Sequence, residues 1–282
     1  MLVPTEQLLN QARRDRYAVG AFNVYTIEGI RAVVQAAQQT RSPSILQVLP
    51  RALEIGGTPL IAACLEAARR APVPVSVHLD HCRSGETIEM ALAAGISSVM
   101  ADGSHRPYEE NLAFTRSITK RAMAYGKSVE AELGRLSGNE DGQNVAKREA
   151  SLTDPGQAEA FVQETGVQAL AVCIGNIHGK YHMPPNLDFD RLKAIADRVA
   201  VPLVLHGTSG LPDDMIARSV DLGVCKFNVN TELRNACLAA GGAYLAETEK
   251  PELVERMEAE IQAMKTPVIS KIRLFRCEGR AS

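Results

Sequence analysis

Short apolar runs recur along the chain, and each is followed by a segment whose apolar residues have helical spacing. The runs occupy residues 17–23, 44–49, 75–80, 97–102, 128–133, 169–174, 202–206 and 224–229. Strands that alternate with helices form parallel sheets. Eight such units in 282 residues predict an α/β protein that folds as a TIM (β/α)8 barrel. An open, doubly wound sheet is the structural alternative. We expect residues 1–282 to form a single barrel domain.

Two segments depart from this alternation. Residues 134–154 are polar, rich in glycine and longer than an ordinary βα loop, which makes them a candidate lid over an active site. Beyond the eighth unit the chain continues as a C-terminal helical extension at about 249–276. Met257, Ile261 and Met264 share one face of that helix, so we expect this face to pack on the barrel or on a partner subunit.

Charge and composition exclude several kinds of partner. The net charge is −2, and the basic and acidic residues are interspersed, so no dense basic surface is expected for nucleic acid or an anionic membrane. The apolar runs have the length of strands, and the N-terminus M-L-V-P-T-E-Q lacks the features of a secretory signal. The six cysteines include no C-x-x-C pair and are expected to be reduced. A cytoplasmic location follows as the expectation.

Polar residues gather where the predicted strands end, which is the catalytic face of a parallel barrel. They are Asn23, Asp80, His81, Asp102, Glu132, His178, His206, Asn228 and Asn230. The three histidines follow strands three, six and seven. Three imidazoles around one cation with an open position are typical of catalytic zinc. The other histidines, His78, His105 and His182, are expected to support the ligands or the fold.

Glycines and hydroxyl residues occupy the loops after strands six, seven and eight. These loops read G-K after His178, H-G-T-S-G at 206–210 and N-V-N-T at 228–231. The loops after strands seven and eight form a recurrent phosphate site in such barrels, because backbone N–H groups and helix N-termini attract anions. The sequence therefore predicts a metal beside a phosphate pocket.

An ordered series of motifs runs through nearly the whole chain: G-A-F-N-V, V-H-L-D-H, M-A-D-G-S-H, E-A-E-L-G, G-N-E-D-G, I-G-N-I-H-G, L-V-L-H-G-T-S-G-L and K-F-N-V-N-T-E-L-R. The series resembles the class II, zinc-dependent fructose-bisphosphate and tagatose-bisphosphate aldolases. The short length and the R-C-E-G-R-A-S tail are closer to the tagatose-bisphosphate branch.

The resemblance implies a role for each matching residue. His81, His178 and His206 would bind Zn²⁺, with Asp80 as the acid/base, while Glu132 and Asp102 would form an alternative metal position or orient the ligands. Glu140 would enter the site as the long loop closes. The substrate pocket for dihydroxyacetone phosphate would include Asn23, Gly179, Gly207, Ser209, Asn228, Asn230 and Thr231. A monovalent cation (Na⁺ or K⁺), a homodimer or homotetramer and an accessory subunit also occur in relatives.

The implied reaction is reversible cleavage of a ketose 1,6-bisphosphate, of tagatose or fructose type, to dihydroxyacetone phosphate and an aldehyde such as glyceraldehyde 3-phosphate. The departures from the usual family pattern concern the aldehyde half of the substrate and the sugar specificity. They are Leu49, Arg51, Arg106 and Asn230. We hypothesise that Arg51 or Arg106 binds a distal anion; a solvated surface arginine is the alternative. Another anionic ketose 1-phosphate, such as 6-deoxy-6-sulfofructose 1-phosphate or a deoxy-keto-gluconate phosphate, remains an alternative substrate.

Two rival functions use the same barrel. A Schiff-base aldolase could employ Lys226 or Lys180, although three histidines at one rim would then have no purpose. A non-catalytic subunit could bind a sugar phosphate as a sensor or stabilise a partner. The set of Asp80, Glu140 and three histidines favours zinc catalysis.

Overall fold

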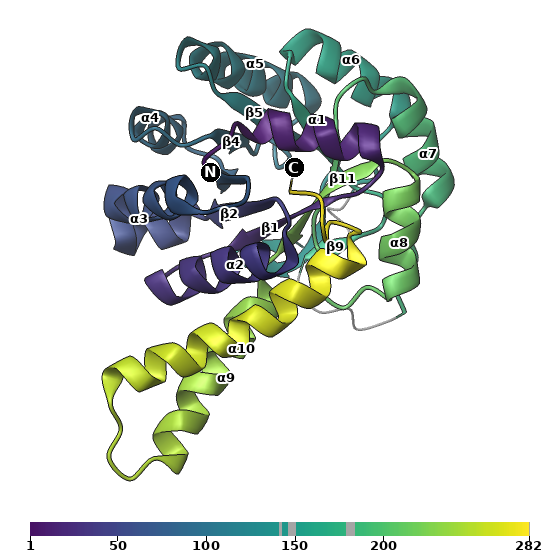
Figure 1. The fold of residues 1–282 in the computed structure, drawn as a ribbon. Coiled ribbons are helices and arrows are strands. Elements are labelled where there is room, and N and C mark those ends of the chain that lie inside the picture. Colours follow the sequence, from purple (N-terminus) through teal and green to yellow (C-terminus); the bar gives the residue numbers. More distant parts are fainter. Residues whose placement is uncertain (141–142, 146–150, 179–183, 282) are drawn as a thin grey trace.

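The structure is a computed structural model that describes residues 1–140, 143–145, 151–178 and 184–281 (Figure 1). The side chains of 137–140, 143–145 and 178 lie outside that description. In the described part of the chain, every helix is too short or too polar to span a lipid bilayer.

Eight parallel strands close into a barrel, which confirms the TIM-barrel prediction and shows that the open-sheet alternative is wrong. Around the barrel the order is β1-β11-β10-β8-β5-β4-β3-β2. The strands are β1 (Val19–Asn23), β2 (Ser44–Val48), β3 (Val75–Cys82), β4 (Ser98–Ala101), β5 (Ser128–Leu133), β8 (Ala169–Val172), β10 (Leu203–Leu205) and β11 (Val224–Val229). The predicted strands match these in order, because the strands are buried on both faces at nearly every position and therefore read as mainly apolar runs.

Helices alternate with the strands on the outside of the barrel. They are α2 (Ile27–Thr40), α3 (Pro50–Arg70), α4 (Gly85–Ala93), α5 (Tyr108–Ala124), α6 (Pro155–Thr165), α7 (Phe189–Arg198) and α8 (Asp213–Asp221). Four of these helices have an N-cap side chain that accepts a hydrogen bond from a backbone N–H in the first turn. The N-cap residues are Thr26, Ser84, Asp154 and Asp188.

The first helix, α1 (Thr5–Asp15), lies across the N-terminal end of the barrel (Figure 1). The hydroxyl of Thr5 is 3.1 Å from the hydroxyl of Ser76 and 2.6 Å from that of Ser98, at the starts of β3 and β4. Helix α1 thus covers the N-terminal end, and the functional groups of such barrels lie at the opposite, C-terminal rim.

Two helices follow the last strand and form a hairpin that extends away from the barrel (Figure 1). They are α9 (Thr231–Glu247) and α10 (Leu253–Leu274), and α10 covers most of the extension expected at about 249–276. The helix that returns to the barrel is α10, which packs on α2 and β1. From the predicted apolar face, Ile261 and Met264 pack against Ala32 of α2, and Met257 is half-buried.

The segment 134–154, expected to be a long loop and a candidate lid, carries two short strands. These are β6 (Ser137–Glu140) and β7 (Gln143–Val145), which pair as an antiparallel hairpin. A third strand, β9 (Ile177–His178), pairs in parallel with β6 and places the backbone of His178 opposite Gly138. The long segment and the loop after β8 are therefore joined by backbone hydrogen bonds.

Candidate metal centre

The end of β3 presents two neighbouring residues to the same site. In a regular strand, successive side chains point to opposite faces. Here the pairing of β3 with β4 is irregular between Leu79 and Cys82, and His81 has a left-handed backbone with φ of 44°. Such a conformation is costly for a residue with a side chain and occurs at functional sites. As a result Asp80 Oδ1 lies 3.9 Å from His81 Nε2.

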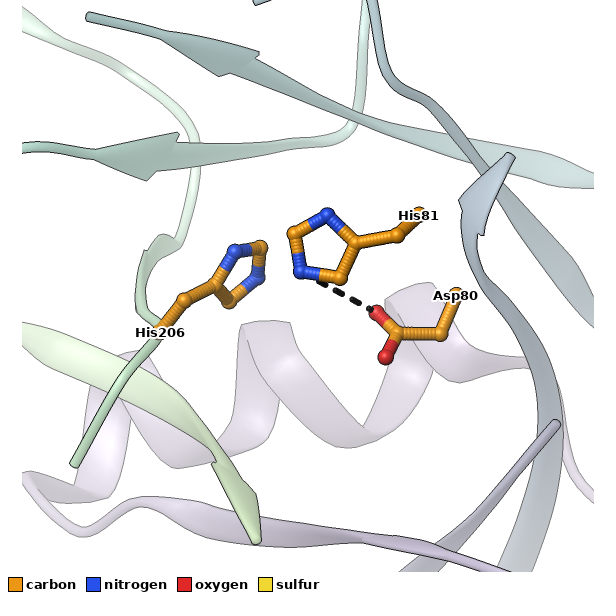
Figure 2. A group of neighbouring side chains, drawn as sticks. All are labelled: Asp80, His81 and His206. Atoms are coloured by element: carbon orange, nitrogen blue, oxygen red, sulfur yellow. Dashed lines mark ion pairs between the residues drawn. The ribbon is translucent and has the colours of Figure 1, made fainter. Parts of the chain in front are cut away.

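The second histidine follows β10 at the same rim. The rings of His206 and His81 meet edge to face, with their centroids 4.6 Å apart (Figure 2). One ligand atom from each of Asp80, His81 and His206 lies within 4.8 Å of the others, a spacing that one cation can bridge. His206 is followed by Gly207, whose φ of 63° favours glycine and turns the chain away from the strand.

A second potential cation group shares His81 and lies at the ends of β4 and β5. Its other members are Asp102 and Glu132, with Asp102 Oδ2 3.4 Å and Glu132 Oε2 4.0 Å from His81 Nδ1. Asp102 also accepts hydrogen bonds from the backbone N–H and the hydroxyl of Ser104. Two alternative positions for one cation are compatible with this arrangement.

The electrostatics of the cluster suit a divalent cation. Burial by itself would lower the pKa of His81, but Asp80, Asp102 and Glu132 outweigh burial and raise it to about 10. Three buried carboxylates beside two imidazoles therefore attract positive charge. Imidazole nitrogen and carboxylate oxygen are common zinc ligands, so these residues fit the metal.

Three side-chain amides surround the carboxylate of Asp80. Its Oδ2 accepts from Gln47 Nε2 at 2.9 Å and from Asn23 Nδ2 at 3.2 Å, while Oδ1 accepts from Asn228 Nδ2 at 3.0 Å. Burial would raise the pKa of Asp80, yet the nearby positive groups, led by His81 and Lys226, lower it. Asp80 is thus an oriented, ionised carboxylate, as a general base requires.

The barrel interior beneath these ligands holds a polar network that sequence reasoning missed. Glu130 Oε1 lies 3.0 Å from His206 Nε2, and Lys226 Nζ lies 3.0 Å from Glu130 Oε2. Burial would raise the pKa of Glu130, but Lys226 and His206 lower it. Glu130 has the same strand parity as Glu132, and this spacing of two was the signal that could have placed it inside the barrel.

The remaining histidines lie away from the two cation groups or outside the described residues. His78 is buried, with Nδ1 2.7 Å from the Ser98 hydroxyl, and burial together with Lys226 lowers its pKa to about 4. His105 is half-buried in the loop after β4. His182, like the candidate residues Gly179 and Lys180, falls outside the described residues.

Two predicted site residues are described in their backbone only. His178 ends β9, and Glu140 ends β6 in the same small sheet. Asn176, two residues before His178, donates from Nδ2 to the carbonyl of His206 at 3.0 Å, so the segment leading to His178 is tied to the second histidine. The backbone thereby brings the third predicted ligand and the predicted lid glutamate into one small sheet.

The predicted phosphate residues lie where β10 and β11 end. Thr208 donates to the carbonyl of Asn228 at 3.0 Å and joins the two loops. Asn230 precedes α9 and accepts from the Tyr25 hydroxyl at 2.9 Å, and Thr231 is the first residue of that helix. Ser209 donates to Glu232 at 2.5 Å. The first turn of α9 is therefore close to Asn228, which contacts Asp80.

The two arginines proposed for a distal anion lie in different surroundings. Arg51 is exposed in the first turn of α3, where it forms an ion pair with Glu54. The guanidinium of Arg106 lies 4.5 Å from the centre of the Phe114 ring, and Arg106 lines a cavity of about 160 Å³ with Ser104, Asn111 and Gly134. Arg106 thus borders a cavity beside the ends of β4 and β5, near Asp102 and Glu132.

Comparison with known proteins decides the family. The model of the family described as "Fructose-bisphosphate aldolase class-II" matches residues 3–280. The chain belongs to this family. The resemblance inferred from the motifs is confirmed, and so is the expectation of a class II aldolase enzyme. Members of the family depend on zinc in general, in agreement with the donor set around His81.

Similar proteins share the whole length of this class II aldolase. The chain is 43% identical to the D-tagatose-1,6-bisphosphate aldolase subunit GatY of Klebsiella oxytoca, over 99% of both chains. The crystal structure of the YdjI aldolase from Escherichia coli K12 superposes with a TM-score of 0.90 at 35% identity, covering 100% of both. A putative fructose-1,6-bisphosphate aldolase from Coccidioides immitis gives 0.91 at 33% identity, over 98% of this chain and 97% of that one.

Proposed function

We propose that this class II aldolase is zinc-dependent and reversibly cleaves a ketose 1,6-bisphosphate of tagatose or fructose type. Its products would be dihydroxyacetone phosphate and an aldehyde such as glyceraldehyde 3-phosphate. The observation that carries the proposal is the convergence of Asp80, His81 and His206 at the C-terminal rim of the barrel. Family membership and the full-length relative at 43% identity support it.

The metal would be held by His81, His206 and His178, with Asp102 and Glu132 as the alternative position or as supports of the ligands. When bound there, Zn²⁺ acts as a Lewis acid that stabilises negative charge on the substrate oxygen at C2. The cluster of carboxylates shared around His81 supports this assignment.

Asp80 would carry the proton transfers at the C4 hydroxyl. In cleavage it removes that proton, the C3–C4 bond breaks, and the aldehyde leaves while the electron pair stays on C3 beside the carbonyl carbon. Glu140 would then protonate C3 to release dihydroxyacetone phosphate. The amides of Asn23, Gln47 and Asn228 orient Asp80 for its step. Glu140 ends β6, and β6 pairs with β9, the strand that ends at His178; this backbone pairing supports the assignment of Glu140 to the site.

The phosphate of dihydroxyacetone phosphate would bind at the ends of β10 and β11. Asn230 and Thr231 begin α9, Ser209 donates to Glu232 in its first turn, and Gly207 lies in the loop after β10. Backbone N–H groups at the start of a helix favour an anion. Asn23 and Asn228 would contact the sugar, and Gly179 would complete the pocket. A monovalent cation, Na⁺ or K⁺, near these loops belongs to the same proposal. Replacing K⁺ and Na⁺ by choline should then lower kcat.

The assembly and location form a further part of the proposal. Helix α9 exposes Leu238 and Leu245, at 69% and 53%, on a helix that projects from the barrel. Exposed apolar residues on a projecting helix favour burial in a homodimer or homotetramer. The word "subunit" in the name of the Klebsiella oxytoca relative supports an accessory subunit as the alternative partner. All six cysteines are free thiols, which supports the cytoplasm.

A retro-aldol screen of the zinc-loaded protein tests the function. Fructose 1,6-bisphosphate, tagatose 1,6-bisphosphate, 6-deoxy-6-sulfofructose 1-phosphate and deoxy-keto-gluconate phosphates are compared by the release of dihydroxyacetone phosphate or the corresponding three-carbon product. We expect the highest kcat/KM with a 1,6-bisphosphate. A higher kcat/KM with another anionic ketose phosphate would assign that compound as the substrate instead. If no substrate is cleaved while zinc is bound, the chain is instead a sugar-phosphate-binding subunit.

A further inference from the structure

Lys226 lies at the centre of the barrel and has no step in the proposed reaction. Its side chain is fully buried, and Nζ contacts both oxygens of Glu130 at 3.0 and 3.3 Å. On its own strand, Nζ also donates to Asn228 Oδ1 at 2.6 Å. A buried ammonium group that makes these contacts is paired and hydrogen-bonded, which is the condition for keeping a charge inside a protein.

The first of these contacts leads to a metal ligand. Glu130 Oε1 accepts from Lys226 and also lies 3.0 Å from His206 Nε2. A carboxylate that is paired with an ammonium group can only accept, so His206 carries its hydrogen on Nε2. The lone pair is then on Nδ1, the nitrogen that lies 3.7 Å from Glu132 Oε1. Carboxylates orient metal-binding histidines in this way and fix their tautomer.

The second contact leads to the general base. An ammonium group has donors only, so the oxygen of the Asn228 amide must face Lys226. Its nitrogen is then turned to Asp80, where Nδ2 donates to Oδ1 at 3.0 Å. Without Lys226 the amide could turn over, and its oxygen would face the carboxylate of Asp80. The orientation of Asn228 thus depends on the lysine.

We propose that Lys226 is a positioning residue that orients His206 through Glu130 and Asp80 through Asn228. One buried ammonium group then sets both a zinc ligand and the base of the proposed aldolase. This inference rests on the proposed function, and it assigns to Lys226 a role other than the Schiff base of the rival mechanism. It predicts two separate effects: the contact through Glu130 affects metal affinity, and the contact through Asn228 affects turnover. These two contacts are the two branches of the network.

Three variants separate the branches. For Lys226→Met, Glu130→Gln and Asn228→Ala, zinc affinity is measured by competition with a chromogenic chelator, and the visible spectrum of the Co²⁺-loaded protein reports ligand geometry. We expect Lys226→Met to weaken zinc binding by about 10- to 100-fold and to change the Co²⁺ spectrum. Glu130→Gln should weaken zinc binding as well. Asn228→Ala should keep the zinc affinity and the Co²⁺ spectrum of the wild type.

Turnover at saturating zinc gives the second readout. Lys226→Met and Asn228→Ala should both lower kcat. Glu130→Gln should lower kcat less than either of them. The proposal is wrong if Lys226→Met keeps zinc affinity and kcat within twofold of the wild type and leaves the Co²⁺ spectrum unchanged. It is also wrong if only the thermal stability of Lys226→Met changes.

A double variant keeps the test decisive if Lys226→Met does not fold. Removing both charges in Lys226→Met with Glu130→Leu leaves no unpaired buried ion, and such replacements often preserve folding. The folded double variant should still bind zinc more weakly and turn over more slowly, and wild-type values for both would overturn the proposal. Because metal affinity and the Co²⁺ spectrum need no substrate, they test Lys226 separately from the retro-aldol screen.

Discussion

Asp80 and His81 are neighbours in the chain, and their side chains nevertheless face the same centre, with Asp80 Oδ1 3.9 Å from His81 Nε2 (Figure 2). The irregular pairing of β3 and the left-handed backbone of His81 make this possible. The end of β3 thereby provides both the proposed base, Asp80, and a proposed metal ligand, His81. The two should be separable by mutation, because one transfers protons and the other holds the metal.

Asp80→Asn should lower kcat by about 10²- to 10⁴-fold, the range typical of general acid–base catalysis. The variant should retain bound zinc at the wild-type ratio, since the amide is nearly isosteric and the predicted ligands are histidines. Kinetics combined with metal analysis of the same sample measure both. His206→Ala is the matched control and should lose zinc. A loss of zinc from Asp80→Asn would instead make Asp80 a metal ligand.

Chelation should abolish the activity, and added Zn²⁺ should restore it, because no residue replaces the Lewis acid. Borohydride in the presence of dihydroxyacetone phosphate should leave the mass of the protein unchanged. Lys226 is buried against Glu130, whereas a Schiff base requires an accessible neutral amine. Mass spectrometry of the intact protein follows the reaction. A reduced adduct on Lys226 or Lys180, with activity preserved in EDTA, would support the rival mechanism.

The arginine that binds a distal anion should be needed only by substrates that carry one. We expect Arg106→Ala or Arg51→Ala to lower kcat/KM for a ketose 1,6-bisphosphate by about 10- to 100-fold, as the loss of a charged hydrogen bond implies. The same variant should leave kcat/KM for fructose 1-phosphate unchanged. Arg116→Ala, which removes an exposed arginine paired with Glu164, is the control. Equal losses for both substrates would exclude a role in anion recognition.

Gly134, directly after β5, should tolerate no side chain. Its φ is 88°, and an added Cβ would lie 2.7 Å from Thr153 Oγ1 and 2.9 Å from the carbonyl of Ser151. Gly134→Ala should therefore lower the free energy of unfolding by about 2 kcal/mol or more, from backbone strain and steric overlap together. Gly126→Ala is the control, because its φ of 66° carries similar strain without any neighbour within 4 Å. Urea unfolding of both variants compares them, and equal losses would argue against the steric part.

If α9 forms a subunit interface, charges on its exposed apolar positions should dissociate the oligomer. Leu238→Glu with Leu245→Glu should give a monomer in light scattering, since buried carboxylates without partners are unfavourable. Met123→Glu changes an equally exposed apolar residue on α5 and should leave the oligomer intact. An unchanged mass for the double variant would place the interface elsewhere or show that the protein is a monomer.

The sequence by itself determined the barrel and the family. Each strand of a parallel barrel is buried on both faces, so Ala169–Val172 or Leu203–Leu205 is recognisable as an apolar run without knowledge of its neighbours. The rule that functional groups follow the strands then placed Asp80, His81 and His206 at one rim. Their motifs indicated class II aldolases, and the family match confirmed it.

Only the tertiary structure decided which of these groups touch. The bulge at the end of β3, which brings Asp80 and His81 to one side, depends on pairing with β4 and leaves no periodic signal. The ion pair of Glu130 with Lys226 joins residues 96 positions apart across a closed barrel. In the same way, the eighth helix position is filled by α10, because α9 leaves the barrel before the chain returns. Local spacing predicts elements, whereas contacts between distant strands follow from closure of the barrel.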